Sequence, residues 1–186
     1  MSDIEYKSEE EKQFAMFLDE CKEHQLIYDY AYETMSFELL PDKTYVEAVS
    51  GKKAVKLVER SLHASANYTP DFRVTFSERG LSVLRDVFKK SILTSKGNPV
   101  LWFDTKGTFS RQDDGRHFSL LQKLFYDKHG IWVERVVPKK LFPKAFAPEG
   151  VRWMKARKKP TKTKMGLQSK TIDEFLKENE DENNGN

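Results

Sequence analysis

Two short segments, Tyr68-Thr69-Pro70-Asp71-Phe72 and Trp102-Phe103-Asp104-Thr105-Lys106-Gly107, decide the fold predicted for this chain. Each segment is predicted to form a short buried strand that carries one carboxylate among apolar neighbours. The second segment adds a lysine two residues after its aspartate. Because residues i and i+2 of a strand lie on the same face, Asp104 and Lys106 are expected to point together. Two acids and an amine would then lie on one face of the protein.

The composition describes a highly charged protein of one domain with additional segments. The chain has 186 residues, of which 38% are hydrophobic and 33% are charged. Cys21 is the single cysteine, which excludes a disulfide framework and a thiolate zinc site. No apolar run approaches the length needed to span a bilayer, and the acidic N-terminus does not resemble a signal peptide. We therefore expect a cytoplasmic protein, in the host cytoplasm if the source is viral.

The segments around the two strands predict helices on a sheet. Ser8 and Glu11 form a capping-box pattern before a helix that runs to about residue 23 or 24. Residues 27–40 and 55–63 are predicted strands. Leu81, Leu84, Phe88 and Ile92 predict one helix capped by Ser77, within an insertion at about 77–96.

The later part of the domain predicts a crossover. Residues 108–116 read as a polar loop, and the helix after it is expected to end at Gly130. Residues 131–137 form a predicted strand, so that strand, helix and strand make a crossover connection. The fold class is therefore α/β or α+β, with a central mixed sheet flanked by helices.

The sequence lacks the motifs of several enzyme classes. There is no GxxxxGK[ST], GxGxxG or GxSxG pattern, and the four histidines show no metal-ligand spacing. Nucleotide-driven motors, dinucleotide enzymes and serine hydrolases are therefore excluded.

The two acids suit the hydrolysis of phosphodiesters. That reaction needs an activated water and a counter-charge for the developing phosphorane, which Mg²⁺ or Mn²⁺ held by carboxylates supplies. Asp71 and Asp104 would bind the metal with the carbonyl of Thr105, and Lys106 would orient water or neutralise phosphate charge. Taken singly, each aspartate reads as an edge or turn residue, and Asp104 with Lys106 as a surface ion pair. Taken together, they favour a site.

Pro70-Asp71 followed by Asp104-Thr105-Lys106 resembles the signature of the PD-(D/E)xK nuclease superfamily, whose fold is restriction-endonuclease-like. The likeness is greatest to small phage nucleases and extends over about residues 8–137. It implies DNA cleavage with a divalent metal and often a glutamate from the first helix. Glu11 matches that position best, with Glu10 as the neighbouring candidate, and the capping box is an equally good role for Glu11. The inserted helix between the two strands departs from the usual short hairpin.

Further residues are predicted to contact DNA. Gln122 and Tyr126 resemble the Gln-x-x-x-Tyr motif of RecB-like members, although such a pair is more often the polar shoulder of an amphipathic helix. Arg116 and a basic segment after the domain add positive charge for phosphates. That segment contains Lys155, Arg157, Lys158 and Lys159. A solvated tail that keeps the protein soluble is an equally good interpretation of its charge.

The chain is divided by these patterns into a domain at 1–154 and a disordered tail at 155–186. Residues 169–176 resemble a sliding-clamp-binding peptide in which Ile172, Phe175 and Leu176 form the apolar plug. The alternative is a short amphipathic helix that packs on its own domain.

The sequence thus predicts a Mg²⁺- or Mn²⁺-dependent DNA endonuclease of replication, recombination or repair. A non-catalytic DNA-binding or replisome-adaptor protein that keeps the fold is the alternative, and an RNase or a transposase-like nuclease subunit is a third. All of these site predictions depend on whether the insertion leaves the strands of Asp71 and Asp104 paired.

Overall fold

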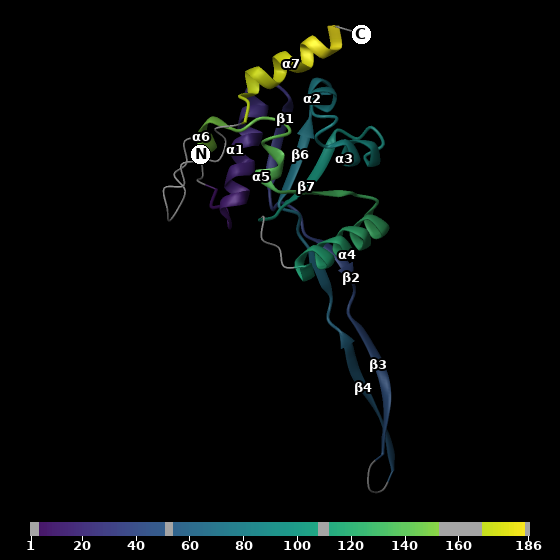
Figure 1. Cartoon of the computed structure of the whole chain (residues 1–186). Coiled ribbons are helices and arrows are strands. Elements are labelled where there is room, and N and C mark those ends of the chain that lie inside the picture. The colour runs from purple at the N-terminus through teal and green to yellow at the C-terminus, as the bar shows by residue number, and fades with distance from the viewer. Residues whose placement is uncertain (1–3, 51–53, 108–111, 153–168, 185–186) are drawn as a thin grey trace, which may run out of the picture. The chain divides into compact units, whose positions relative to one another are not determined.

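A computed structural model describes residues 4–50, 54–107, 112–152 and 169–184 (Figure 1). The chain divides into two compact units. The first combines Met1–Thr34 with Pro70–Asn186, and the second is Met35–Thr69. The boundary that the sequence predicts after residue 154 lies outside the described residues.

The first unit is built on a four-stranded mixed sheet, in the order β1 (Ile27–Tyr32), β6 (Phe72–Phe76), β7 (Val100–Thr105) and β8 (Val133–Val136). β6 pairs antiparallel with both β1 and β7, and β7 pairs parallel with β8. The sheet confirms the predicted mixed α and β class. It also meets the condition set by the sequence, because the strands that follow Asp71 and contain Asp104 are direct neighbours.

The strand predicted over Tyr68–Phe72 is not continuous, and this prediction was wrong. Tyr68 ends β5 (Ala66–Tyr68) in the second unit, whereas β6 begins at Phe72 in the first. Pro70 lies between them and has no N–H to donate to a ladder. Asp71 therefore lies just before β6, where its side chain does not have to follow the alternation of side chains between the two faces of the sheet.

Helix α1 (Glu9–Glu23) begins and ends as predicted. Ser8 is its N-cap and accepts a 3.2 Å hydrogen bond from the Glu11 N–H. Its apolar face, which follows helical spacing in the sequence, is buried: Phe14, Phe17, Leu18 and Cys21 have no exposed surface. Phe14 contacts Phe72 of β6 and Phe103 of β7, with centroids 5.1 and 5.4 Å apart. The helix therefore packs on the face of the sheet that carries these rings.

The insertion between β6 and β7 forms two short helices, α2 (Glu78–Val83) and α3 (Lys89–Thr94), so the prediction of a single helix was wrong. Its cap was correct, since the Ser77 hydroxyl accepts from the Gly80 N–H. Leu84 and Phe88 lie in the connection and are both buried. Phe88 contacts Phe103 at 5.0 Å, so the inserted segment closes the core on the same face as α1.

Helix α4 (Gln112–His129) is longer than predicted, because residues 112–116 of the expected loop are helical, whereas residues 108–111 lie outside the described part of the chain. Gly130 ends it as predicted, with a φ of +66° and an N–H that donates to the Tyr126 carbonyl at 2.8 Å. The chain then enters β8, parallel to β7, as the crossover prediction requires.

The end of the chain differs from the predicted disordered tail. After α5 (Pro138–Leu141) and α6 (Glu149–Arg152), residues Ile172–Asn184 form helix α7. Ile172, Phe175 and Leu176 belong to the buried core, and Phe175 lies 5.9 Å from Phe146. The prediction of disorder was therefore wrong for residues 172–184. The structure instead has the alternative, an amphipathic helix packed on its own domain, because burial of these apolar side chains offsets the entropy of ordering the tail.

The second unit consists of two antiparallel pairs. β2 (Phe37–Leu40) pairs with β5, and β3 (Lys43–Ser50) pairs with β4 (Val55–His63) to form a hairpin. The predicted strand at 55–63 is confirmed, and the predicted strand region at 27–40 contains β1 and β2. Cross-strand bonds join Arg60 to Glu47 at 2.9 Å and Thr44 to Glu59 at 2.7 Å.

Candidate active site

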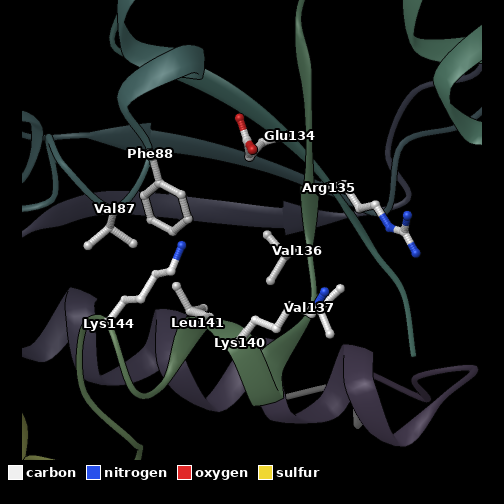
Figure 2. Close-up of a pocket in the computed structure, with 9 residues that line it drawn as sticks. All are labelled: Val87, Phe88, Glu134, Arg135, Val136, Val137, Lys140, Leu141 and Lys144. Carbon is white, nitrogen blue, oxygen red and sulfur yellow. The ribbon is translucent and has the colours of Figure 1, made fainter. Parts of the chain in front are cut away.

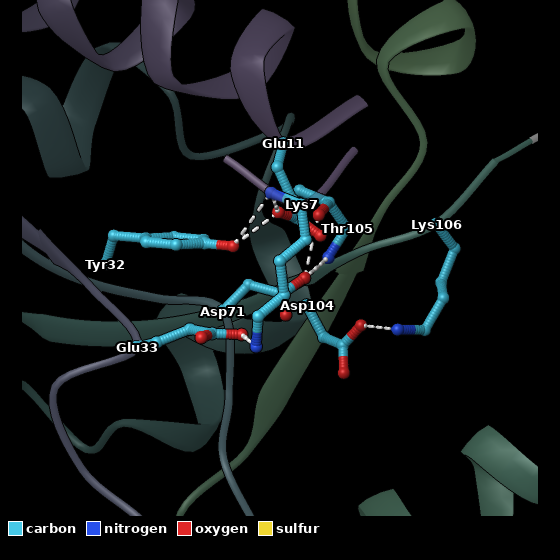
Figure 3. A network of polar contacts seen from close by, with 8 residues as sticks. All are labelled: Lys7, Glu11, Tyr32, Glu33, Asp71, Asp104, Thr105 and Lys106. Atoms are coloured by element: carbon cyan, nitrogen blue, oxygen red, sulfur yellow. Dashed lines mark hydrogen bonds and ion pairs between the residues drawn. The ribbon is translucent and has the colours of Figure 1, made fainter. Parts of the chain in front are cut away.

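Asp71 and Asp104 meet where β6 and β7 lie side by side (Figure 3). Phe72 is the register partner of Phe103, so Asp71 lies next to Asp104 across the pair. Both residues are buried, with 8% and 3% of their surface exposed. Oδ2 of Asp71 accepts hydrogen bonds from the N–H of Thr105 at 2.6 Å and from its hydroxyl at 2.7 Å. These two bonds hold Asp71 against the end of β7.

The electrostatics of the pair favour a bound cation. Burial raises the pKa of Asp71, and the negative charge of Asp104 raises it further, to about 6. The hydrogen bonds from Thr105 and the charge of Lys106 lower this pKa, but by less. A buried carboxylate that lies beside a second acid is stabilised by a positive charge placed next to it.

Lys106 supplies positive charge on the solvent side of the pair. Its Nζ forms an ion pair with Oδ1 of Asp104, as Figure 3 shows. The side chain of Lys106 is 40% exposed whereas that of Asp104 is 4% exposed. Asp104 and Lys106 thus point together as predicted, and their ion pair has one buried partner and is not confined to the surface.

Glu11 is held by the residue before the helix cap, Lys7, and by Tyr32, and not by the N–H of Ser8 that a capping box would use. Its Oε2 accepts from the backbone N–H of Lys7 at 2.8 Å and from the Tyr32 hydroxyl at 2.5 Å. Burial and this bond to Glu11 raise the pKa of Tyr32. Oε1 of the neighbouring candidate Glu10 would be 3.3 Å from a Cβ added to Gly107, so Glu10 lies beside the segment that follows β7.

Lys7 and Glu33 extend the charged network and were missed by sequence reasoning. Nζ of Lys7 lies 2.5 Å from Oε1 of Glu33. The N–H of Glu33 donates to the backbone carbonyl of Asp71 at 2.8 Å, and Glu33 has a left-handed φ of 45°. This conformation is uncommon outside glycine and places Glu33 at the end of β1 beside Asp71. The sequence offered no signal for it, because the pairing of β1 with β6 was not predictable.

Arg135 was also missed by sequence reasoning. It is the register partner of Asp104 on the parallel strand β8. Its Cζ lies 5.9 Å from the ring centroid of Phe118 on α4, and Nζ of Lys106 lies 5.9 Å from the same ring. A basic residue inside the predicted strand 131–137 was the available signal. Only the parallel pairing of β7 with β8 connects it to the acids.

The predicted DNA-contacting residues on α4 do not join the acids through any observed bond. The amide of Gln122 donates to the Val133 carbonyl at 2.6 Å and so anchors the helix to β8. Tyr126 packs on Trp132 with centroids 6.0 Å apart, and Arg116 is exposed. Their contact with DNA stays a prediction. Four other predicted contacts lie outside the described residues: Lys155, Arg157, Lys158 and Lys159.

The acids fit a hard divalent ion in donor type and in charge. Asp71 and Asp104 offer carboxylate oxygens, which Mg²⁺ and Mn²⁺ prefer, and Mg²⁺ is commonly held by one or two carboxylates plus waters and substrate phosphates. Among the residues that the structure describes, no group of three or more His, Cys, Asp or Glu side chains is arranged to hold a metal. Glu11 is thus not gathered with the two aspartates into one such group.

A pocket on the other side of β8 is separate from the acids. Figure 2 shows the side chains of Phe88, Glu134 and Lys144 around it, with Arg135 pointing away from them. The Glu134 carboxylate in this pocket accepts from the Ser91 hydroxyl at 2.6 Å. This bond ties α3 to β8 and gives Glu134 a structural role.

No match to this chain was found in comparisons with models of protein families, with characterised proteins and with solved structures. Within the described part of the chain, no helix is both long and apolar enough to cross a membrane.

Proposed function

We propose that the protein is a Mg²⁺- or Mn²⁺-dependent nuclease that hydrolyses phosphodiester bonds in DNA during replication, recombination or repair. The single observation that carries the proposal is the pairing of β6 with β7, which brings Asp71 and Asp104 together although an insertion separates them in sequence. The resemblance to the PD-(D/E)xK signature agrees with this arrangement, and the restriction-endonuclease-like fold is part of the proposal.

Each residue of the site has a distinct role in the proposed chemistry. Asp71 and Asp104 would hold the metal, with the Thr105 carbonyl as a further ligand. A bound divalent ion supplies charge for the transition state and lowers the pKa of water. The N–H and hydroxyl of Thr105 fix the orientation of the Asp71 carboxylate before substrate arrives. Preorganisation of this kind avoids a cost of reorienting charge during the reaction.

Lys106 would act on the substrate side of Asp104. Its ion pair with Asp104 keeps the ammonium at the site, and its exposed surface leaves it accessible to a phosphate or to the attacking water. Once a cation binds Asp104, the ammonium can turn from the carboxylate to the phosphate, because a lysine side chain is long and flexible. Glu11 would complete the site from α1 only after its carboxylate leaves the Lys7 N–H and the Tyr32 hydroxyl.

The test is cleavage of supercoiled, linear, single-stranded, flapped and four-way-junction DNA with Mg²⁺ or Mn²⁺. We expect cutting by the wild type and loss of at least about a hundredfold in rate for Asp104→Asn and Lys106→Ala, as for groups that act directly on charge in the transition state. A matched control is Asp29→Asn, an exposed aspartate on the same sheet that pairs with Lys22 at 2.7 Å. Cutting that survives both site variants would refute the assignment of these residues.

A second candidate function is a non-catalytic DNA-binding or replisome-adaptor protein. The observation in its favour is that Glu11 is engaged by Lys7 and Tyr32, and no three-acid metal group exists among the described residues. It predicts salt-sensitive DNA binding without dependence on metal and no cutting of any substrate. In this case, recruitment through a sliding clamp would require α7 to leave the core, since Ile172, Phe175 and Leu176 are buried.

A further inference from the structure

We propose that Arg135 of β8 binds a backbone phosphate of the nucleic acid beside the acid pair, acting with Lys106. This inference rests on the proposed function, because its ligand is the substrate of that site. Its first support is the register of the sheet, in which Arg135 is the parallel partner of Asp104. Neighbouring strands lie about 4.8 Å apart, so the start of the Arg135 side chain is one strand away from Asp104.

The direction of the Arg135 side chain supports this role. Successive residues of a strand point to opposite faces. Glu134 points to the face covered by α3, where Ser91 donates to it, and Figure 2 shows Arg135 pointing away from that group. Arg135 consequently lies on the face that α4 covers, where Phe118 contacts it. Lys106 reaches the same ring.

Phe118 serves as a fixed platform for the two cations. Its side chain is buried, with 6% of its surface exposed, so the ring does not move freely. Nζ of Lys106 and Cζ of Arg135 each lie 5.9 Å from its centroid. A cation at this distance is attracted by the negative face of an aromatic ring, which restricts where its charge resides. One ring therefore keeps an ammonium and a guanidinium within one small region next to Asp104.

The chemistry of this region favours a phosphodiester. Asp71 and Asp104 repel an approaching phosphate, so the site needs positive charge beyond that of the metal. Lys106 adds an ammonium that is held by Asp104. Arg135 adds a planar guanidinium, whose parallel N–H groups have the geometry that matches two phosphate oxygens. The competing explanation is that Arg135 only offsets the charge of its neighbour Asp104. That role would affect stability but not the number of phosphates bound.

The experiment measures binding of a labelled DNA duplex by fluorescence anisotropy in EDTA, at several salt concentrations. For Arg135→Gln we expect affinity to fall about tenfold or more, as for a lost charge-assisted hydrogen bond. The slope of log affinity against log salt should also become shallower by about 0.9. The control is Lys89→Gln, which removes one exposed charge from α3, the helix that contacts β8 from the opposite side. It should change neither quantity.

Unchanged affinity and slope in Arg135→Gln would overturn the inference. If circular dichroism shows that this variant does not fold, Arg135→Lys replaces it, because lysine keeps the charge and loses the fork. Weaker binding with an unchanged slope then supports a phosphate contact, and unchanged affinity overturns it. A protein that binds DNA through Arg135 but never cuts would refute the nuclease and leave this inference standing. If Arg135→Gln cuts and binds DNA like the wild type, the inference about Arg135 is refuted and the nuclease proposal stands.

Discussion

Replacing Asp71 by asparagine should stabilise the protein at alkaline pH. The pKa of Asp71 is raised from 3.8 to about 6 in the folded protein, so the folded state holds a proton on this group more tightly than the unfolded state does. Between these two pH values the unfolding free energy falls as pH rises, and above about pH 6 the full cost of burying the charge is present. A shift of about 2 pH units corresponds to about 3 kcal/mol.

Asparagine removes this cost and keeps the local geometry. Its side-chain oxygen can accept the two hydrogen bonds that Thr105 donates to Oδ2 of Asp71. In EDTA at pH 8 we therefore expect Asp71→Asn to raise the unfolding free energy by up to about 3 kcal/mol. At pH 4 the gain should shrink to about 0.5 kcal/mol, because Asp71 of the wild type is then protonated in the folded state.

The assay is urea unfolding followed by fluorescence at pH 4, 5, 6 and 8. Asp29→Asn is the control, because the pKa of Asp29 is lowered, first by its bond to Lys22, so that loss of its charge should not stabilise the protein at pH 8. Adding Mg²⁺ should stabilise the wild type by about 2.7 kcal/mol at one hundred times its dissociation constant, and Asp71→Asn by much less. An unfolding free energy of Asp71→Asn that exceeds that of the wild type equally at pH 4 and pH 8 would refute the reasoning.

Three further predictions concern the surroundings of the site. Glu11→Gln should change the unfolding free energy by less than about 1 kcal/mol in urea, since the amide oxygen can still accept from Lys7 and Tyr32. It should nevertheless slow cleavage at least about tenfold, and an unchanged rate would leave Glu11 with its structural bonds to Lys7 and Tyr32 alone. Phe175→Ala should lower the unfolding free energy by about 3 kcal/mol because the ring packs on Phe146, and equal stability to the wild type would show that α7 is detached in solution. Gly80→Ala should lower the melting temperature strongly, because a Cβ there would lie 1.8 Å from the Leu26 carbonyl oxygen. Gly97→Ala, at a φ of +86° but with open space around it, should cost only about 1 kcal/mol. Equal melting temperatures for the two variants would contradict the close contact at Gly80.

Local patterns predicted the parts of the structure that depend on neighbouring residues. Ser8 and Ser77 cap helices, and Gly130 ends one, because each of these bonds closes within a few residues. The face of α1 was readable because burial follows helical spacing. The break between α2 and α3 could not be predicted from spacing, since it depends on how Phe88 packs on the rings of Phe17, Phe76 and Phe103.

The C-terminal segment also shows that local patterns do not predict long-range packing. Its charge and its linker composition predicted disorder, and its three apolar residues suggested a free peptide. Those residues are buried against a core formed by distant segments, including Phe146. Composition can predict whether an isolated segment has enough apolar residues to fold, but it does not show whether the rest of the fold offers a surface on which the segment packs.

By itself, the sequence determined the chemistry available to this protein: two aspartates, a lysine two residues after the second, and the helices and strands that carry them. Only the tertiary structure decided that Asp71 lies beside Asp104, that Glu33 after β1 and Arg135 on β8 are their neighbours, and that α7 is part of the core. The physical reason is that strand pairing and burial join residues far apart in the chain. Such contacts depend on the whole fold, whereas caps, turns and periodicity depend on a few residues.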